Sequence, residues 1–169
     1  MESPKCGHGV ISITLSSDVL PVDPSAALGP PPCEAELLGH LIELYFAHIH
    51  PHFPMIDRPV FMEKLKEKQT EVSLRHFSLL LNSMCALVTQ HARTLDGFRD
   101  SAIPALHRAF YERARVLIGK LFNWPHIDSV QALLLLTLVG AGPNQDASSY
   151  YYIALARSQA VELGMHRDL

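Results

Sequence analysis

The strongest constraint on the fold is a run of apolar residues in the last quarter of the chain. Residues 132–139 read Ala-Leu-Leu-Leu-Leu-Thr-Leu-Val, so a helix formed there is apolar on every side rather than along one stripe. The run over 132–141 is well short of the roughly 20 residues that span a bilayer. We therefore expect a central helix that needs neighbours on all sides.

Amphipathic segments elsewhere in the chain supply such neighbours, because their apolar residues recur every three or four positions. The first predicted helix covers 37–49 and stops at His50-Pro51, since a residue that precedes proline avoids helical geometry. Asp57, with Pro59 in the first turn, predicts the start of a short second helix. The predicted fold class is all-α, a multi-helix bundle of about six helices.

The remaining helices are expected over 74–92, 101–122 and 147–163. Asp128 followed by Gln131 predicts a capping box at the start of the central helix. Gly164 is placed to act as the left-handed C-terminal cap of the last helix. Because the apolar run needs so much cover, we expect the isolated chain to expose apolar surface and to self-associate.

The first 33 residues differ in composition from the rest of the chain. They hold six of the twelve prolines, and Pro30-Pro31-Pro32 favours an extended conformation. Residues 10–15 form a candidate short strand without an evident partner strand. We expect 1–33 to be a disordered Pro/Ser-rich leader or linker and 34–169 to be one helical domain.

Charge and cysteine content exclude several classes of protein. The formal net charge of −3 offers a phosphate backbone no attraction, so this chain alone is a poor DNA binder. Cys6, Cys33 and Cys85 are too few and too widely spaced for a disulfide framework or a four-cysteine zinc site, and they suit a reducing compartment. No signal peptide is evident, and we expect a soluble intracellular protein.

Candidate chemistry is sparse, and we assign no catalytic, cofactor-binding or metal-binding residue. His48, His50 and His52 are the one arrangement that suggests a metal, and they define an alternative reading as a metal-dependent hydrolase. At a helix end, however, residues two apart point about 200° away from each other. Cys85 lies mid-helix on the apolar side, where a thiol is usually inert. We expect no enzyme.

A second alternative is a helical module that binds a small-molecule effector in an apolar pocket between helices. Its candidate polar groups are Arg113, Gln131 and Tyr151. Tyr150, Tyr151 and Tyr152 place aromatic area on more than one side of the last helix, for which core packing and helix contact are the ordinary explanation.

Three stretches together resemble the fungal-specific transcription factor regulatory domain, also called the middle homology region or the xylanolytic activator regulatory domain. The stretches are residues 41–61, which include LIELYF and HPHFPMIDRPVF; residues 130–136, VQALLLL; and residues 154–168, ALARSQAVELGMHRD. They occur in the order of the family's motifs, and the resemblance covers about 40–168.

The resemblance implies an all-helical regulatory module of a nuclear transcription factor, with protein partners in transcription and a possible effector. Zinc and DNA binding belong, in such factors, to a separate six-cysteine module, so we expect neither zinc nor DNA binding in this chain. The family domain normally continues beyond its LGLHRD motif, whereas this chain stops at Leu169. We therefore expect the N-terminal part of the domain only, truncated on its C-terminal side.

Overall fold

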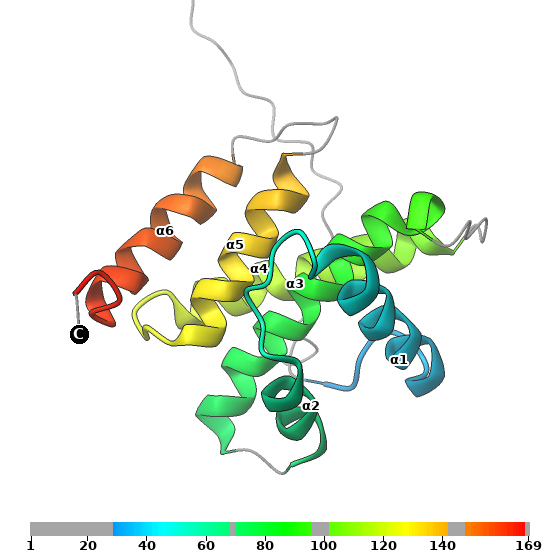
Figure 1. The fold of residues 1–169 in the computed structure, drawn as a ribbon, viewed down its shortest axis with the longest axis horizontal. Coiled ribbons are helices and arrows are strands. Elements are labelled where there is room, and N and C mark those ends of the chain that lie inside the picture. Colours follow the sequence, from blue (N-terminus) through cyan, green and yellow to red (C-terminus); the bar gives the residue numbers. More distant parts are fainter. Residues whose placement is uncertain (1–28, 68–69, 96–101, 142–147, 168–169) are drawn as a thin grey trace, which may run out of the picture.

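The computed structural model describes residues 29–67, 70–95, 102–141 and 148–167, and within these ranges every regular element is helical (Figure 1). The predicted all-α class is therefore confirmed. Most of the expected leader, including the candidate strand at 10–15, lies outside the described residues. The elements in chain order are α1 (Ala35–Leu44), η2 (Tyr45–Ile49), α2 (Arg58–Lys66), α3 (Glu71–Leu95), α4 (Ile103–Leu121), α5 (Ile127–Gly140) and α6 (Ser148–Glu162).

Helices α3 and α5 lie at the centre of the bundle. Helix α3 packs against α4 and α5 and also contacts α1, while α6 packs on the other side of α5 at one end of the molecule (Figure 1). No residue from Val130 to Gly140 is exposed, so the predicted burial of the apolar helix is confirmed. Residues 71–92 of α3 are also long and apolar enough to cross a membrane by length and composition, but 72% of that window is buried, as in the core helix of a bundle.

The first predicted helix contains an irregular turn. Helix α1 ends at Leu44 and continues directly into the π-helical turn η2, which holds one more residue than an α-helical turn. Tyr45 and Phe46 are consequently both buried, with their rings edge to face at 5.2 Å. Phe46 contacts Phe61 of α2, which contacts Phe77 of α3, so one aromatic row joins three elements.

Replacing Tyr45 with Phe is expected to raise the free energy of unfolding by about 1 kcal/mol. The Tyr45 side chain is fully buried, and its hydroxyl has no hydrogen-bond partner among the described residues, so the substitution removes an uncompensated polar group. The matched control is Tyr111→Phe, because the Tyr111 hydroxyl lies 3.1 Å from that of Tyr152 and the variant should lose about 1 kcal/mol. Urea titrations followed by circular dichroism compare the two, and equal losses would contradict the prediction.

Two of the helix caps predicted from the sequence are confirmed, and one is wrong. Asp57 caps α2 as predicted, its carboxylate accepting a hydrogen bond from the Val60 N–H at 2.9 Å, and Gly164 adopts the predicted left-handed conformation with φ 73°. The capping box predicted from Asp128 and Gln131 is wrong. His126 is the N-cap of α5, and its Nδ1 accepts from the Asp128 N–H.

The capping box fails because both side chains have long-range partners. Asp128 forms an ion pair with Lys64 of α2, and the Gln131 amide donates to the backbone carbonyl of Met55 at 2.6 Å. These contacts connect α5 to segments more than 60 residues away along the chain. The Asp128 and Gln131 side chains therefore make tertiary contacts, and His126 supplies the local cap.

Gly140 allows α5 and α6 to approach closely, and Gly140→Ala is expected to lower the free energy of unfolding by about 1 kcal/mol. A Cβ at this position would lie 3.0 Å from the Ser149 Cβ and 3.4 Å from the Ser149 backbone nitrogen. The control is Gly119→Ala in α4, where nothing lies within 4 Å and the better helix former should add up to about 1 kcal/mol. Chemical denaturation of both variants measures the two signs, and stabilisation of both would contradict the close approach.

Candidate functional site

A pocket of about 320 Å³ lies where residues 29–33, which we call the strap, pass over α2, α3 and α4. We call this cavity the strap pocket, and its volume is in the range of small-molecule sites. Its walls are mostly apolar, with a few polar groups at one side. The apolar lining is Leu38, Leu65, Leu74, Phe77, Leu81 and Phe110; the polar lining is Lys64, Glu67, Ser78, Asn82 and Arg113; and the strap contributes Gly29 and Pro31.

Arg113 is the principal polar group of the strap pocket. Its Nε donates to the Asn82 Oδ1 at 3.2 Å, and its Nη2 donates to the Gly29 carbonyl at 2.6 Å. Asn82 is itself buried, and its amide donates to the Ser78 carbonyl at 2.7 Å. Burial lowers the pKa of Arg113, although a guanidinium remains charged at neutral pH. The pocket therefore holds an oriented cation at the edge of an apolar space.

The three polar groups proposed from the sequence for an effector pocket do not come together. Arg113 lines the strap pocket, whereas Gln131 holds the Met55 carbonyl in the loop before α2. Tyr151 is exposed on α6. Of the three, Arg113 alone lines the strap pocket.

A second group of polar side chains, the α5 cluster, lies at the N-terminal end of α5. It consists of Lys64, His76, His126, Asp128 and Ser129. The Lys64 Nζ donates to both carboxylate oxygens of Asp128, at 2.7 and 2.9 Å, and the Asp128 side chain is only 2% exposed. The His76 Nδ1 and the Ser129 Oγ are 2.7 Å apart, and the His76 ring stacks on His126 at 4.5 Å.

Serine, histidine and aspartate side chains thus occur in one cluster, but their arrangement is structural. Asp128 is engaged by Lys64 rather than by His76, and Ser129 is fully buried. Burial and the neighbouring His126 lower the pKa of His76 to about 4, with Asp128 opposing the shift. His76 is therefore neutral at physiological pH, and the cluster joins α2, α3 and α5 through satisfied polar contacts.

The structure separates the three histidines of the candidate metal motif. His48 and His52 line a small pocket of about 230 Å³ together with His91 of α3, whereas His50 packs against the rings of Tyr45 and Phe46. Among the described residues, no group of three or more histidine, cysteine, aspartate or glutamate side chains is arranged to hold a metal ion. His50 thus lies on a different side from His48 and His52, as expected for residues two apart at a helix end.

Of the two described cysteines, Cys33 lies just before α1 and Cys85 lies within α3. Cys85 is fully buried, and burial raises the pKa of its thiol far above the ordinary value, so it packs as an apolar group. Cys33 is half-buried, and burial also raises the pKa of its thiol. Neither shift is in the direction that activates a nucleophile.

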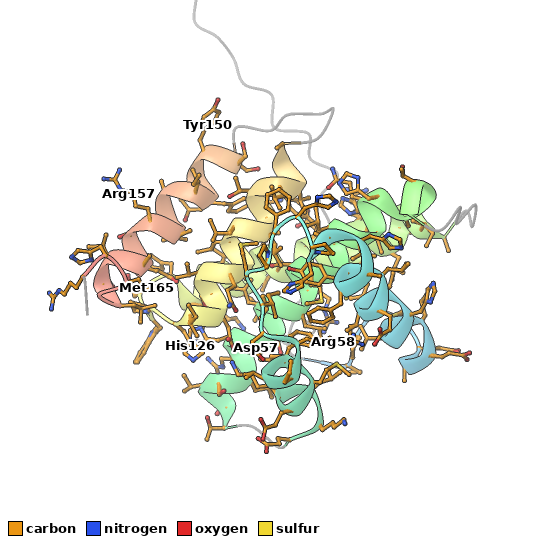
Figure 2. The ribbon with its side chains drawn as sticks, in the orientation of Figure 1. Asp57, Arg58, His126, Tyr150, Arg157 and Met165 are labelled. Atoms are coloured by element: carbon orange, nitrogen blue, oxygen red, sulfur yellow. The ribbon has the colours of Figure 1, made fainter. Side chains whose placement is uncertain are left out.

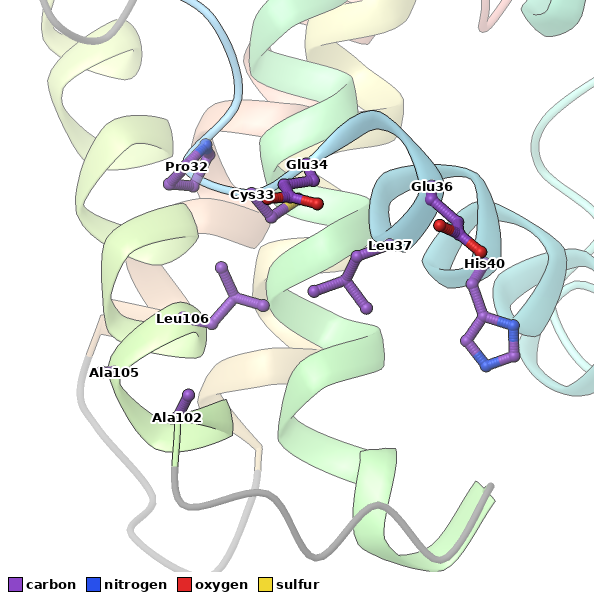
Figure 3. Close-up of a pocket in the computed structure, with 9 residues that line it drawn as sticks. All are labelled: Pro32, Cys33, Glu34, Glu36, Leu37, His40, Ala102, Ala105 and Leu106. Carbon is purple, nitrogen blue, oxygen red and sulfur yellow. The ribbon is translucent and has the colours of Figure 1, made fainter.

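A broader groove of about 820 Å³ lies on the other side of the strap, between α1 and the first turns of α4 (Figure 3). Leu37 of α1 and Leu106 of α4 point toward each other across the groove. Cys33 and Pro32 lie at one end, and Glu36 and His40 lie at the other. The groove is wide and open to solvent. It carries no buried charged group comparable to Arg113.

Helix α6 presents its outer face to solvent. It packs on α5 through a narrow stripe of Ser149, Tyr152, Ala156 and Gln159. Tyr150 and Arg157 point away from the bundle (Figure 2), and Tyr150 is 71% exposed. The exposed apolar surface predicted from the sequence is thus present, in part on the outer face of α6 and the turn that follows it. Its large members are Tyr150, Tyr151, Ile153, Val161, Leu163 and Met165.

Comparison with known proteins identifies the family to which these residues belong. A family model described as the fungal specific transcription factor domain matches residues 42–169, which cover η2, α2 to α6 and the C-terminal end of α1. The chain belongs to this family. The resemblance predicted from the three motifs is confirmed.

The curated relatives of this fungal transcription factor domain are named as regulators. An acetamidase regulatory protein of Aspergillus fumigatus is 30% identical over 137 residues, covering 80% of this chain and 17% of the relative. Cutinase transcription factor 1 alpha of Fusarium vanettenii is 31% identical over 137 residues, covering 79% and 14%. The nitrogen assimilation transcription factor nit-4 of Neurospora crassa is 29% identical over 144 residues, covering 79% and 13%.

The chain therefore spans about one sixth of the length of the curated relatives that it matches. No solved structure gives a significant match to the chain. The family motifs acquire structural roles here: residues 41–61 form the aromatic row and the capped start of α2, and residues 130–136 form the buried part of α5. The third motif forms the C-terminal part of α6 and its Gly164 cap.

Sequence reasoning missed two contacts that define this domain. The Lys64–Asp128 ion pair had no local signal, because the partners are 64 residues apart. The contact between Arg113 and the Gly29 carbonyl involves backbone, so no side-chain pattern marks it. The prolines after Gly29 were the one available sign that this segment is extended.

Proposed function

We propose that this chain is the regulatory, non-catalytic part of a fungal transcription factor that acts in the nucleus. The observation that carries the proposal is the family match over 42–169, which coincides with the helical bundle. Relatives named as transcription factors and regulatory proteins support a role in transcription. In this proposal the chain forms the N-terminal part of a larger regulatory domain, and a separate zinc-containing segment of the factor binds DNA.

The proposal assigns contacts with other proteins, or with the rest of the same factor, to the described surface. The exposed apolar side chains of α6 support this assignment, because apolar patches on soluble proteins commonly mark interaction sites. The net charge of −3 supports placing DNA binding outside residues 1–169.

Deletion of codons 42–169 in the producing fungus, in frame, tests the function. We expect altered levels of a defined set of transcripts and a nuclear signal from a fluorescently tagged chain. A matched pair of point variants tests whether the fold of this domain is what the function needs. The destabilising Lys64→Met should reproduce the effect of the deletion, and Gly119→Ala should behave as the unmodified gene. An unchanged transcriptome after deletion would overturn the proposal.

DNA binding by the purified chain gives an independent check. Residues 1–169 should produce no nanomolar, salt-dependent shift of duplex DNA, because such binding needs several cationic contacts to phosphates. A shift that weakens steeply with salt would place DNA contacts in this chain and contradict the proposed division of roles.

A second candidate function is a helical effector-binding module, and the strap pocket favours it. An enclosed space with apolar walls and a few oriented polar groups is the usual form of a small-molecule site. The metal-dependent hydrolase considered from the sequence has no comparable support, since His50 packs against Tyr45 and Phe46 rather than beside His48 and His52.

A further inference from the structure

We propose that the strap pocket binds a small monocarboxylate with an apolar body, and that its carboxylate takes the place on Arg113 that the Gly29 carbonyl holds in this structure. The inference extends the regulatory function proposed above, on which its biological meaning rests. It begins from the combination of apolar walls and one oriented guanidinium in a space of about 320 Å³. Such a space accepts a ligand with one anionic end and a compact apolar remainder.

The guanidinium is held in a fixed orientation before any ligand binds. Asn82 accepts from the Arg113 Nε, and Asn82 is itself fixed by its hydrogen bond to the Ser78 carbonyl. The Nη2 atom then faces the strap, where it donates to the Gly29 carbonyl. A guanidinium that is already held in place loses little conformational freedom when a ligand binds. Binding therefore costs less entropy here than at a flexible cationic side chain.

A carboxylate is a better acceptor for this group than a backbone carbonyl. In a hydrogen bond between a guanidinium and a carboxylate both partners are charged, and the two groups can form two parallel bonds, which a single backbone carbonyl cannot do. The 2.6 Å contact to Gly29 shows that an oxygen atom already fits at this position. The ligand oxygen would therefore replace one neutral oxygen with a charged one at the same place.

The other charged groups of the pocket permit an anion there. Lys64 adds a second positive charge to the lining, and its Nζ also contacts Asp128. Glu67 is the one described acidic side chain of the lining, and it is exposed at the rim, where water and salt screen its repulsion. The apolar part of the ligand would contact Leu81, Phe77 and Phe110.

Binding in this manner would release the strap. Pro30, Pro31 and Pro32 have no N–H, so these residues cannot donate backbone hydrogen bonds that would hold the strap in place. Loss of the Gly29–Arg113 contact would therefore loosen the strap where it passes over α4. Cys33, which packs partly against the core at the end of the strap, would then become more accessible.

Isothermal titration of the full chain with hexanoate, phenylacetate and 3-phenylpropionate, each beside its primary amide, tests the binding step. We expect at least one acid to bind, and its amide to bind at least about tenfold more weakly, because only the acid adds an opposite charge to the hydrogen bond with the guanidinium. Absence of binding by all three acids, or equal binding of acids and amides, would overturn the proposal.

Two variants locate the site. Arg113→Met removes the guanidinium and should weaken binding of the acid by about 10- to 100-fold. Ser78→Leu fills the pocket while leaving Arg113 in place and should also abolish binding. Thermal melts establish that each variant is folded, and the second variant keeps the test valid if the first is not. Full affinity in a folded Arg113→Met or Ser78→Leu chain would contradict the site.

The strap provides a readout that does not depend on heat of binding. In a Cys6→Ser background, Cys33 is the accessible thiol, since Cys85 is fully buried. We expect the bound acid to accelerate the reaction of Cys33 with Ellman's reagent several-fold, and the amide to leave it unchanged. Binding without a change in rate would overturn the strap displacement. Failure of these tests with a positive transcript experiment would overturn this inference alone and leave the proposed function standing.

Discussion

Replacing Lys64 with Met is expected to lower the free energy of unfolding by about 3 kcal/mol or more. The substitution leaves the Asp128 carboxylate, 2% exposed, without the ammonium group that both of its oxygens contact. An uncompensated buried charge is far more costly than the net worth of the pair itself. Urea denaturation at pH 7.5, followed by far-ultraviolet circular dichroism, measures the loss.

Two controls distinguish the buried pair from ion pairs in general. Glu43→Gln removes the partner of Arg58, and because both of those side chains are about half exposed, the cost should stay below about 1 kcal/mol. Combining Lys64→Met with Asp128→Asn removes both charges and should recover part of the loss. If Lys64→Met cost no more than Glu43→Gln, the importance of the buried pair would be refuted.

The second large effect concerns pH, and it originates at His76. The pKa of this imidazole is lowered to about 4 in the folded chain, chiefly by burial, compared with about 6.5 when unfolded. Between these values the unfolded chain binds a proton that the folded chain does not. The contribution of His76 to the free energy of unfolding is therefore fully present above pH 6.5 and decreases as the pH drops toward 4. The total loss is on the order of 3 kcal/mol.

The His76→Gln variant isolates this contribution from other titrating groups. The difference in unfolding free energy between the parent chain and the variant should be constant above about pH 7 and should shrink as the pH falls toward 4. Denaturant titrations at half-unit pH intervals give that difference directly. A difference that stays flat across this range would show that His76 is protonated as easily in the fold as in the unfolded chain.

The sequence predicted the helices well because periodicity is a local property. The apolar circumference of 132–139 correctly indicated a buried helix, and Asp57 and Gly164 act as the caps that their neighbours predict. The π-helical turn at Tyr45–Ile49 was not predicted, because its apolar residues fit the spacing of an ordinary helix. The extra residue is shown by the backbone hydrogen bond from the His50 N–H to the Tyr45 carbonyl, at 2.9 Å.

The site was predictable to a smaller extent, for a physical reason. Arg113 was proposed from the sequence as a polar group of an effector pocket, and it does line a pocket between helices. Gln131 and Tyr151 were proposed with it, yet they lie in other places, since residue type does not encode which distant segment a side chain meets. The α5 capping box failed for the same reason, as Asp128 pairs across 64 residues.

The one-sided packing of α6 determines the order in which parts of the molecule open. Helix α3 cannot separate without losing its contacts with α1, α4 and α5 together, whereas α6 is held by its stripe on α5, the Tyr111–Tyr152 hydroxyl contact and the bond from Gln159 to the Phe122 carbonyl. Backbone amides in α6 should therefore exchange with solvent deuterium through local opening, while those in the middle of α3 exchange only when the whole domain unfolds. A partner that binds through α6 would thus also stabilise this helix against local opening, so that partner binding and the exchange rate of this helix are thermodynamically coupled.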